Sequence, residues 1–298
     1  MLSCHRLRGG CSASDSVANP LPQSPGKVQR EVDEPRLIDT FTEDISRELS
    51  GAFADVNVIA LDLEGVDLSR AGRISIVQVS TPACCFLIDV LGKGPDDLVV
   101  SWLRSLLESE NILKVIHDSR MDSDALFHLL KIELVNVHDT SCWQAVIGLP
   151  NTSLNDILRF YKLTPNIERD KSVYQRNHAF WATRPLTRQM VAWASGDVQF
   201  MFDLYQRQLQ KVESIPNGVS RARVLTLEFL SCCRSAEVSF VTVKNPGIFI
   251  GLRGSNLRAL QERTCTTIYN RGPRTSKQVM VFYNTETDLA VVTQAAGS

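Results

Sequence analysis

Two acidic residues stand two positions apart in an apolar run, Val58-Ile-Ala-Leu-Asp-Leu-Glu-Gly-Val-Asp-Leu68. A run of this kind, bounded by turn-forming residues, is typical of a buried strand. Side chains alternate across a strand, so Asp62 and Glu64 are predicted to lie on the same face. Two ionised carboxylates on an apolar strand are costly unless a cation lies between them, and hard oxygen ligands favour Mg²⁺ or Mn²⁺. The pair is a candidate half of a metal site; the alternative is a strand that runs out into a polar loop, with both acids solvated.

The segment after a later predicted strand contains three more acids, Asp118, Asp122 and Asp124. They fall at the sheet edge where open α/β proteins usually place their ligands. Asp118, or a neighbouring Ser, fits the role of a helix cap. Asp122 lies inside the first turn of the next helix, so it is the better candidate to project a carboxylate across the sheet edge.

A fourth candidate lies on a long predicted helix, residues 187–212. Asp197 is in line with Trp193 on a stripe that is otherwise apolar. An acid on a core-facing stripe needs a partner. A metal shared with the other acids would supply that partner.

Hydrophobic periodicity predicts the elements that must position these acids. A capping box near Thr40 opens a helix that ends at Ser50-Gly51. Three consecutive antiparallel strands come next, followed by alternating helices and strands, so the fold class is α/β, a mixed sheet flanked by helices. Strands are predicted at 58–68, 73–80, 84–90, 112–116 and ending near 137, with helices at 97–107, 121–130, from 140 and at 187–212.

Size and composition exclude several classes. With 298 residues, 44% of them hydrophobic and 22% charged, the chain has room for two globular domains. Its longest apolar runs are too short to span a bilayer, so no membrane association is expected. Its 8 cysteines form no Cys-x-x-Cys motif, which predicts reduced thiols in a cytoplasmic or nuclear protein. Residues 1–35 are rich in Ser, Gly and Pro and are predicted to be a disordered tail, with only a weak resemblance to an organelle transit peptide.

Taken together, the motifs resemble the 3'-5' exonucleases of the ribonuclease D type. The matching segments are Asp62-Leu-Glu64, His117 with Asp122, Asp139-Thr140, Trp181-Ala-Thr-Arg-Pro-Leu-Thr187 and Ala194-Ser-Gly-Asp-Val198. The resemblance implies a ribonuclease H-like domain over residues 36–215. It also implies that Asp62, Glu64, Asp122 and Asp197 are catalytic and bind two divalent cations, Mg²⁺ or Mn²⁺. The expected reaction removes nucleotides from the 3' end of single-stranded RNA or DNA, with RNA favoured.

The chain departs from this family at one position. In the family's tyrosine branch, a Tyr four residues before the last acid orients the attacking water, and here that position is Trp193. An indole N–H can only donate, whereas general-base help is typically worth about 10²- to 10⁴-fold. The alternative function is therefore a weak or inactive RNA-binding adaptor that retains the exonuclease fold, with Trp193 as a core aromatic. If any of the four acids faces away from the others, or a basic side chain fills the gap between them, the hydrolase prediction fails and only RNA binding remains.

The C-terminal part is basic and contains a glycine loop. Residues 216–277 hold ten Lys or Arg against three Glu, a local charge of +7. A connecting helix is predicted within 216–236, with Val224, Leu227, Phe229 and Leu230 packed on a neighbour. Gly251, Leu252, Arg253 and Gly254 lie between an apolar strand end and an amphipathic helix. Residues 237–298 thus resemble a small α+β KH domain, which would bind single-stranded nucleic acid at this loop; Cys265 stands where that family usually has Gly. The alternative is a KH-like fold that only packs against the first domain.

Overall fold

The computed structural model describes residues 34–150, 152–170, 172–173, 177–270 and 277–298, with the side chains of Arg253 and Asn270 also left out. Almost all of the predicted N-terminal tail and the basic loop 271–276 therefore lie outside the described residues. Within these ranges, no helix combines the length and apolar character that crossing a bilayer would require. The six cysteines of the described part are free thiols.

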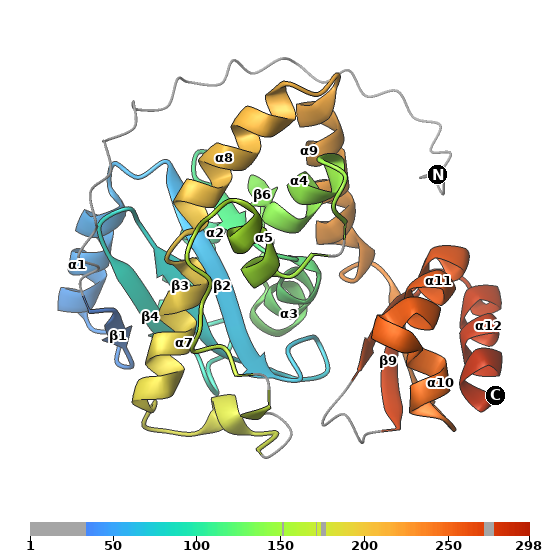
Figure 1. Cartoon of the computed structure of the whole chain (residues 1–298). Coiled ribbons are helices and arrows are strands. Elements are labelled where there is room, and N and C mark those ends of the chain that lie inside the picture. Colours follow the sequence, from blue (N-terminus) through green and yellow to red (C-terminus); the bar gives the residue numbers. More distant parts are fainter. Residues whose placement is uncertain (1–33, 151, 171, 174–176, 271–276) are drawn as a thin grey trace. The chain divides into compact units, whose positions relative to one another are not determined.

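A six-stranded mixed sheet forms the centre of the first domain, in the order β1-β4-β3-β2-β5-β6 (Figure 1). As predicted, β2 pairs antiparallel with β3, and β3 antiparallel with β4, whereas β5 and β6 run parallel to β2. The short β1, which pairs parallel with β4, was not predicted. The bounds are β1 Arg36–Ile38, β2 Val58–Val66, β3 Arg73–Ser80, β4 Cys85–Asp89, β5 Leu113–Ile116 and β6 Val137–Asp139.

Helices cover both faces of this sheet, because β2 is apolar on both sides. One face carries Ile59, Leu61 and Leu63, which share a core cluster with α1, α2 and α3. Ala60 lies on the other face, in the cluster that contains α5, α7 and α8. Asp62 and Glu64 are two and four positions after Ala60, so their side chains lie on the same face of the strand and point toward α7. The helices span α1 Glu43–Phe53, α2 Leu98–Leu107, α3 Arg120–Leu130, α4 Thr140–Val146, α5 Leu154–Phe160, α7 Arg188–Val198 and α8 Met201–Glu213, and the 3₁₀-helix η1 spans Phe180–Ala182.

The predicted single helix over residues 187–212 is wrong in one respect, because the structure has two helices, α7 and α8. The backbone at Phe200, with φ −108° and ψ 12°, leaves the helical conformation between them. Periodicity could not detect this break, because buried side chains of both helices pack in the same cluster on the same face of the sheet. The break places Asp197 in the last turn of α7.

The predicted bounds of the first helix also differ from the structure. Helix α1 begins after Thr42, whose side chain caps it, but continues past Ser50-Gly51 to Phe53. Burial of Phe53 in the core outweighs the weak helix propensity of that dipeptide. Helix α5 and η1 were not predicted at all.

Helix α9 (Gly218–Cys232) lies in the sequence between the strands of the six-stranded sheet and the C-terminal strands, and residues 33–298 together form one compact unit. The prediction that Val224 and Leu227 pack on a neighbour is wrong, since they are 54% and 65% exposed. The buried positions are instead four apart, at Ala222, Thr226 and Leu230. Small residues at the first two let α9 pack closely on α4.

The C-terminal module, residues 237–298, has the element order strand, helix, helix, strand, strand, helix. Its three strands form an antiparallel sheet in the order β7-β9-β8. The residues directly before the glycine loop form a short helix, not the expected strand end, and Leu260 of the following helix is buried. The bounds are β7 Glu237–Thr242, α10 Pro246–Ile250, η2 Leu252–Gly254, α11 Ser255–Thr264, β8 Thr267–Asn270, β9 Gln278–Tyr283 and α12 Glu286–Gly297.

Candidate active site

Strand β2 places its two acids on one face and then bends. Asp62 pairs with Gln78, and Glu64 with Ile76, before the register shifts between Glu64 and Gly65. A Cβ atom on Gly65 would lie 2.1 Å from the carbonyl oxygen of Arg73, so a side chain does not fit there. The glycine therefore permits the irregularity that ends the acidic stretch.

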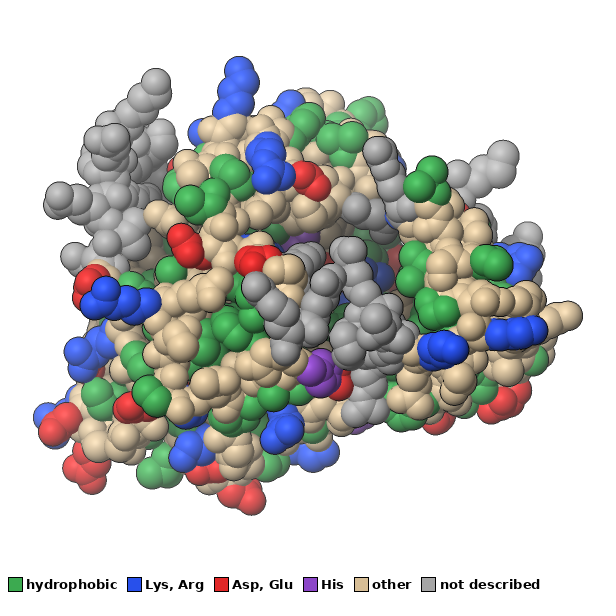
Figure 2. Space-filling view, turned by 60° about the horizontal axis from the view of Figure 1, so that its bottom comes forward, with side chains coloured by type: hydrophobic (Ala, Val, Ile, Leu, Met, Phe, Trp, Pro, Cys, Tyr) green, Lys and Arg blue, Asp and Glu red, His purple; other side chains and the backbone are tan. Residues whose placement is uncertain are grey.

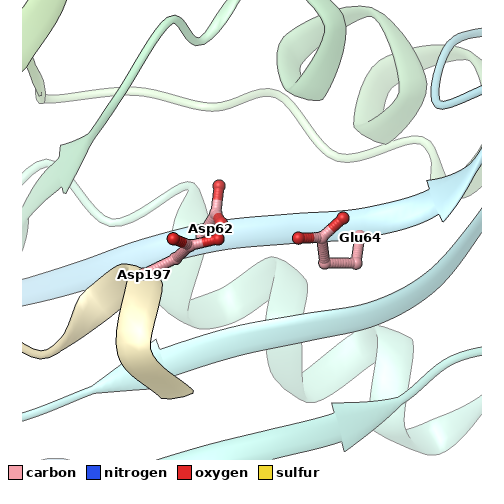
Figure 3. A group of neighbouring side chains, drawn as sticks. All are labelled: Asp62, Glu64 and Asp197. Carbon is pink, nitrogen blue, oxygen red and sulfur yellow. The ribbon is translucent and has the colours of Figure 1, made fainter. Parts of the chain in front are cut away.

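Three carboxylates converge above this strand. Asp62, Glu64 and Asp197 each offer one oxygen, and these oxygens lie within 4.8 Å of one another. Figure 3 shows the Asp197 side chain, from the end of α7, beside Asp62, with the Glu64 carboxylate directed toward both. Asp122, the fourth predicted acid, is buried on α3 but does not belong to this group. The structure thus brings together three of the four predicted residues.

Burial and mutual repulsion raise the pKa values of Asp62, Glu64 and Asp122. The pKa of Asp62 is raised to about 7, mainly by burial and then by the charge of Asp197. Burial and the charge of Asp62 raise the pKa of Glu64 well above its usual value, and Asp122 contributes a smaller part. The pKa of Asp122 is raised by burial, then by Asp62 and Asp118. Since a cation would lower all of these pKa values, this all-oxygen donor set fits a divalent ion such as Mg²⁺ or Mn²⁺.

Asp197 also accepts hydrogen bonds from three side chains. Trp193 Nε1 donates to Oδ2 at 3.1 Å, Asn166 Nδ2 donates to Oδ1 at 2.9 Å, and Arg169 Nη1 lies 3.3 Å from Oδ1. Trp193 is buried and packs edge-on against Trp181, so it is a core aromatic, as predicted. Its indole N–H is directed at the acid. Asn166 and Arg169 were not predicted, because they lie in a loop with no recognisable motif.

Arg169 is the basic side chain that would argue against hydrolysis. Its charge lowers the pKa of Asp62 and of Glu64, which partly offsets burial and repulsion. With this arginine in place, the three carboxylate oxygens still lie within 4.8 Å of one another. Arg169 therefore neutralises part of the charge without separating the acids.

The two acids that flank Asp122 have other partners. Asp118 is bound by Arg120, with Nε to Oδ1 at 2.6 Å and Nη2 to Oδ2 at 2.8 Å. Asp124 accepts the backbone N–H of Arg70 at 2.6 Å and its Nε at 2.8 Å. Both acids are therefore neutralised by arginines, which distinguishes them from Asp122.

Asp139 fixes the start of the helix that carries Asp122. Its carboxylate accepts the backbone N–H groups of Asp118 at 3.1 Å and Ser119 at 2.7 Å, and it caps α4. His117 Nδ1 lies 2.9 Å from Thr140 Oγ1. His117 thus links the end of β5 to the first residue of α4.

A tyrosine of the C-terminal module is electrostatically close to the acids. Tyr269 and Met121, the residue before Asp122, pack against the same apolar cluster. Burial raises the pKa of the Tyr269 phenol to about 12, with further contributions from Asp67 and Asp122. No sequence signal pointed to this residue, because the contact joins distant segments.

Both glycines of the loop have a backbone conformation that other residues rarely adopt. Gly251 and Gly254 have φ values of +72° and +78°, a region that favours glycine. Leu252 is 85% exposed, while the Arg253 side chain lies outside the described residues. Cys265 has a φ of +47°, which explains why a glycine would suit that position. Among the described side chains on the face in Figure 2, Lys and Arg are interspersed with Asp and Glu and form no continuous patch.

The mixed sheet, its flanking helices and the acids on one face of β2 define a ribonuclease H-like α/β domain of the exonuclease type. Residues 38–213 match the sequence profile of the 3'-5' exonuclease family, and the chain belongs to this family. The crystal structure of Trypanosoma brucei RNase D is similar, with a TM-score of 0.58 and 26% identity over 68% of this chain and 74% of that one. A complex of that RNase D with the RNA U12 gives a TM-score of 0.56 and 27% identity over 68% and 72% of the two chains.

Among curated proteins, the piRNA biogenesis protein EXD1 of Mus musculus is 31% identical over 173 residues, which cover 53% of this chain. The exosome complex exonuclease RRP6 of Saccharomyces cerevisiae is 31% identical over 173 residues, 57% of this chain. The chain spans 30% of the length of the first relative and 22% of the second.

Proposed function

We propose that this protein is a metal-dependent 3'-5' exonuclease that removes nucleotides from the 3' end of single-stranded nucleic acid, with RNA favoured over DNA. The grouping of the Asp62, Glu64 and Asp197 oxygens within 4.8 Å carries the proposal. Membership of the exonuclease family supports the reaction type. The RNA complex of the similar RNase D supports the substrate class.

The proposed site uses Asp62, Glu64, Asp122 and Asp197 to hold two divalent ions, Mg²⁺ or Mn²⁺. Such ions lower the pKa of an attacking water and stabilise the charge that develops on the phosphate and on the leaving 3' oxygen. The carboxylates of β2 and α7 supply oxygen ligands on a rigid strand and a helix end. Asp122 would join through the start of α3, which Asp139 holds in place.

Trp193 favours the second candidate function, an RNA-binding adaptor with weak or no turnover. Its N–H donates to Asp197 and it has no acceptor atom, so it cannot orient a water as a phenol can. Arg169 also favours the adaptor, since its guanidinium competes with a metal ion for the carboxylate of Asp197. We expect slow hydrolysis, because the four acids favour the reaction whereas Trp193 and Arg169 disfavour it.

The C-terminal module is proposed to be KH-like and to bind the single strand at Gly251, Leu252, Arg253 and Gly254. The element order and the antiparallel sheet β7-β9-β8 support this assignment. Both glycines have positive φ, which lets the backbone approach a phosphate closely. The module would grip the strand upstream of the 3' end that is trimmed.

A time-resolved digestion of 5'-labelled single-stranded RNA and DNA, with Mg²⁺ or Mn²⁺, tests the proposal. We expect slow shortening from the 3' end, lost in Asp62→Ala and faster in Trp193→Tyr, which restores the phenol. Absence of shortening with either metal, combined with RNA binding that is lost in Gly254→Asp, would establish the adaptor instead.

A further inference from the structure

We propose that Arg169 is a substrate-binding residue that exchanges partners: it holds Asp197 in the metal-free protein and binds a substrate phosphate once divalent ions occupy the acids. This inference rests on the proposed function. It assigns a second, opposite role to the same guanidinium.

The contact between Arg169 and Asp197 is defined by the structure. Arg169 Nη1 lies 3.3 Å from Asp197 Oδ1, and the Asp197 side chain is fully buried whereas that of Arg169 is 26% exposed. The same Oδ1 accepts a hydrogen bond from Asn166 Nδ2 at 2.9 Å. A divalent ion bound by Asp197 would compete with these donors for oxygen lone pairs and would repel the guanidinium.

The backbone near Arg169 is anchored, so the displaced guanidinium must stay close. Asn166 exchanges two hydrogen bonds with Asn155 of α5, one of 2.8 Å through its N–H and one of 2.9 Å through its carbonyl. Asn166 Oδ1 also accepts the backbone N–H of Glu168 at 3.0 Å. Side-chain rotation is therefore the cheapest response to a metal, and it leaves Arg169 beside the acids.

The new partner that we propose for the displaced guanidinium is a phosphate of the substrate. Ions held by the acids reverse the local charge and attract the phosphate of a nucleotide. A guanidinium is a planar fork that binds phosphate with two parallel N–H donors, which a lysine cannot do. Arg169 is thus suited to both partners in turn, the carboxylate first and the phosphate second.

Two affinities of the full chain test the exchange: Mn²⁺ alone, by electron paramagnetic resonance, and AMP at saturating Mn²⁺, by calorimetry. In Arg169→Gln we expect Mn²⁺ to bind roughly threefold to tenfold more tightly, because a competing cation is gone. AMP should bind about tenfold or more weakly, because a charged hydrogen bond is lost. Arg169→Lys keeps the charge and so the Mn²⁺ affinity, but should bind AMP more weakly than wild type.

Arg159→Gln is the matched control, because Arg159 is an exposed arginine of α5 that pairs with Asp156. It should leave both affinities unchanged. Unchanged affinities in both Arg169 variants, in a protein that binds Mn²⁺ and shortens RNA, would overturn the exchange and leave the proposed function standing. A wild-type protein that binds no Mn²⁺ would overturn both. Arg169→Lys alone decides the phosphate role if the Gln variant does not fold.

Discussion

The acids of the candidate site and the acids beside them differ in what neutralises their charge. Burial raises the pKa of Asp118 too, but hydrogen bonds and charge from Arg120 outweigh it, so that pKa is lowered. For Asp62 and Glu64, burial and neighbouring acids outweigh Arg169, so their pKa values are raised. The fold therefore supplies its own cation to Asp118, whereas Arg169 does not offset the effects of burial and neighbouring acids on Asp62 and Glu64. That difference, not the mere presence of acids, is what marks a place for an external cation.

Breaking a structural pair should have the largest effect. Asp124 is fully buried and pairs with Arg70, which is 21% exposed. Asp124→Ala leaves that guanidinium without its carboxylate, so we expect a loss of roughly 3–5 kcal/mol in the free energy of unfolding. Urea denaturation measures it. A loss below about 1 kcal/mol would show that Arg70 finds other acceptors, such as the carbonyl of Cys233 that it already contacts.

Removing an acid of the candidate site should raise the free energy of unfolding, whereas Asp124→Ala lowers it. The folded-state pKa of Asp62 is raised from 3.8 to about 7, so ionising this carboxyl lowers the free energy of unfolding. The loss begins as the pH rises above 4 and is complete above 7. This shift implies roughly 4 kcal/mol, which solvent screening reduces because Asp62 is partly exposed. In EDTA at pH 8 we therefore expect Asp62→Asn to stabilise the protein by about 2 kcal/mol, and the gain should shrink as the pH falls toward 4. Thermal melts across this range measure it, with Asp118→Asn as a destabilised control. A destabilised Asp62→Asn protein would place Asp62 among the structural acids.

The acids of β2 could be predicted from the sequence because strand alternation is a local rule. Asp62 and Glu64 share a face wherever the strand packs, and the apolar run showed that the strand is buried. Asp122 was harder, since the sequence placed three acids at one sheet edge, and only their arginine partners separate them. Arg70 is 54 positions from Asp124. No local pattern contains that pairing.

Contacts that depend on loops and helix breaks could not be predicted. Asn166 and Arg169 reach Asp197 from a segment whose sequence has neither periodicity nor a motif, 31 and 28 positions away. The break at Phe200 leaves the apolar pattern continuous. Val224 and Leu227 were predicted to be buried because they are large and apolar. Close packing on α4 instead selected the smaller Ala222 and Thr226.

The pH dependence of metal binding should show the smallest of the three effects, and it links both groups of acids to function. A metal can use the Asp62 carboxylate only after its proton leaves, and the pKa of that group is raised to about 7. We therefore expect the Mn²⁺ affinity to rise about tenfold or more per pH unit between pH 5.5 and 7, because Asp62 must lose its proton and the pKa values of Glu64 and Asp122 are raised as well. Calorimetry at several pH values measures this, and Asp62→Asn should reduce the slope. Because the pKa of Asp118 is lowered, Asp118→Asn should keep the slope of the wild-type protein; a slope that Asp62→Asn leaves unchanged would mean that another acid releases the proton.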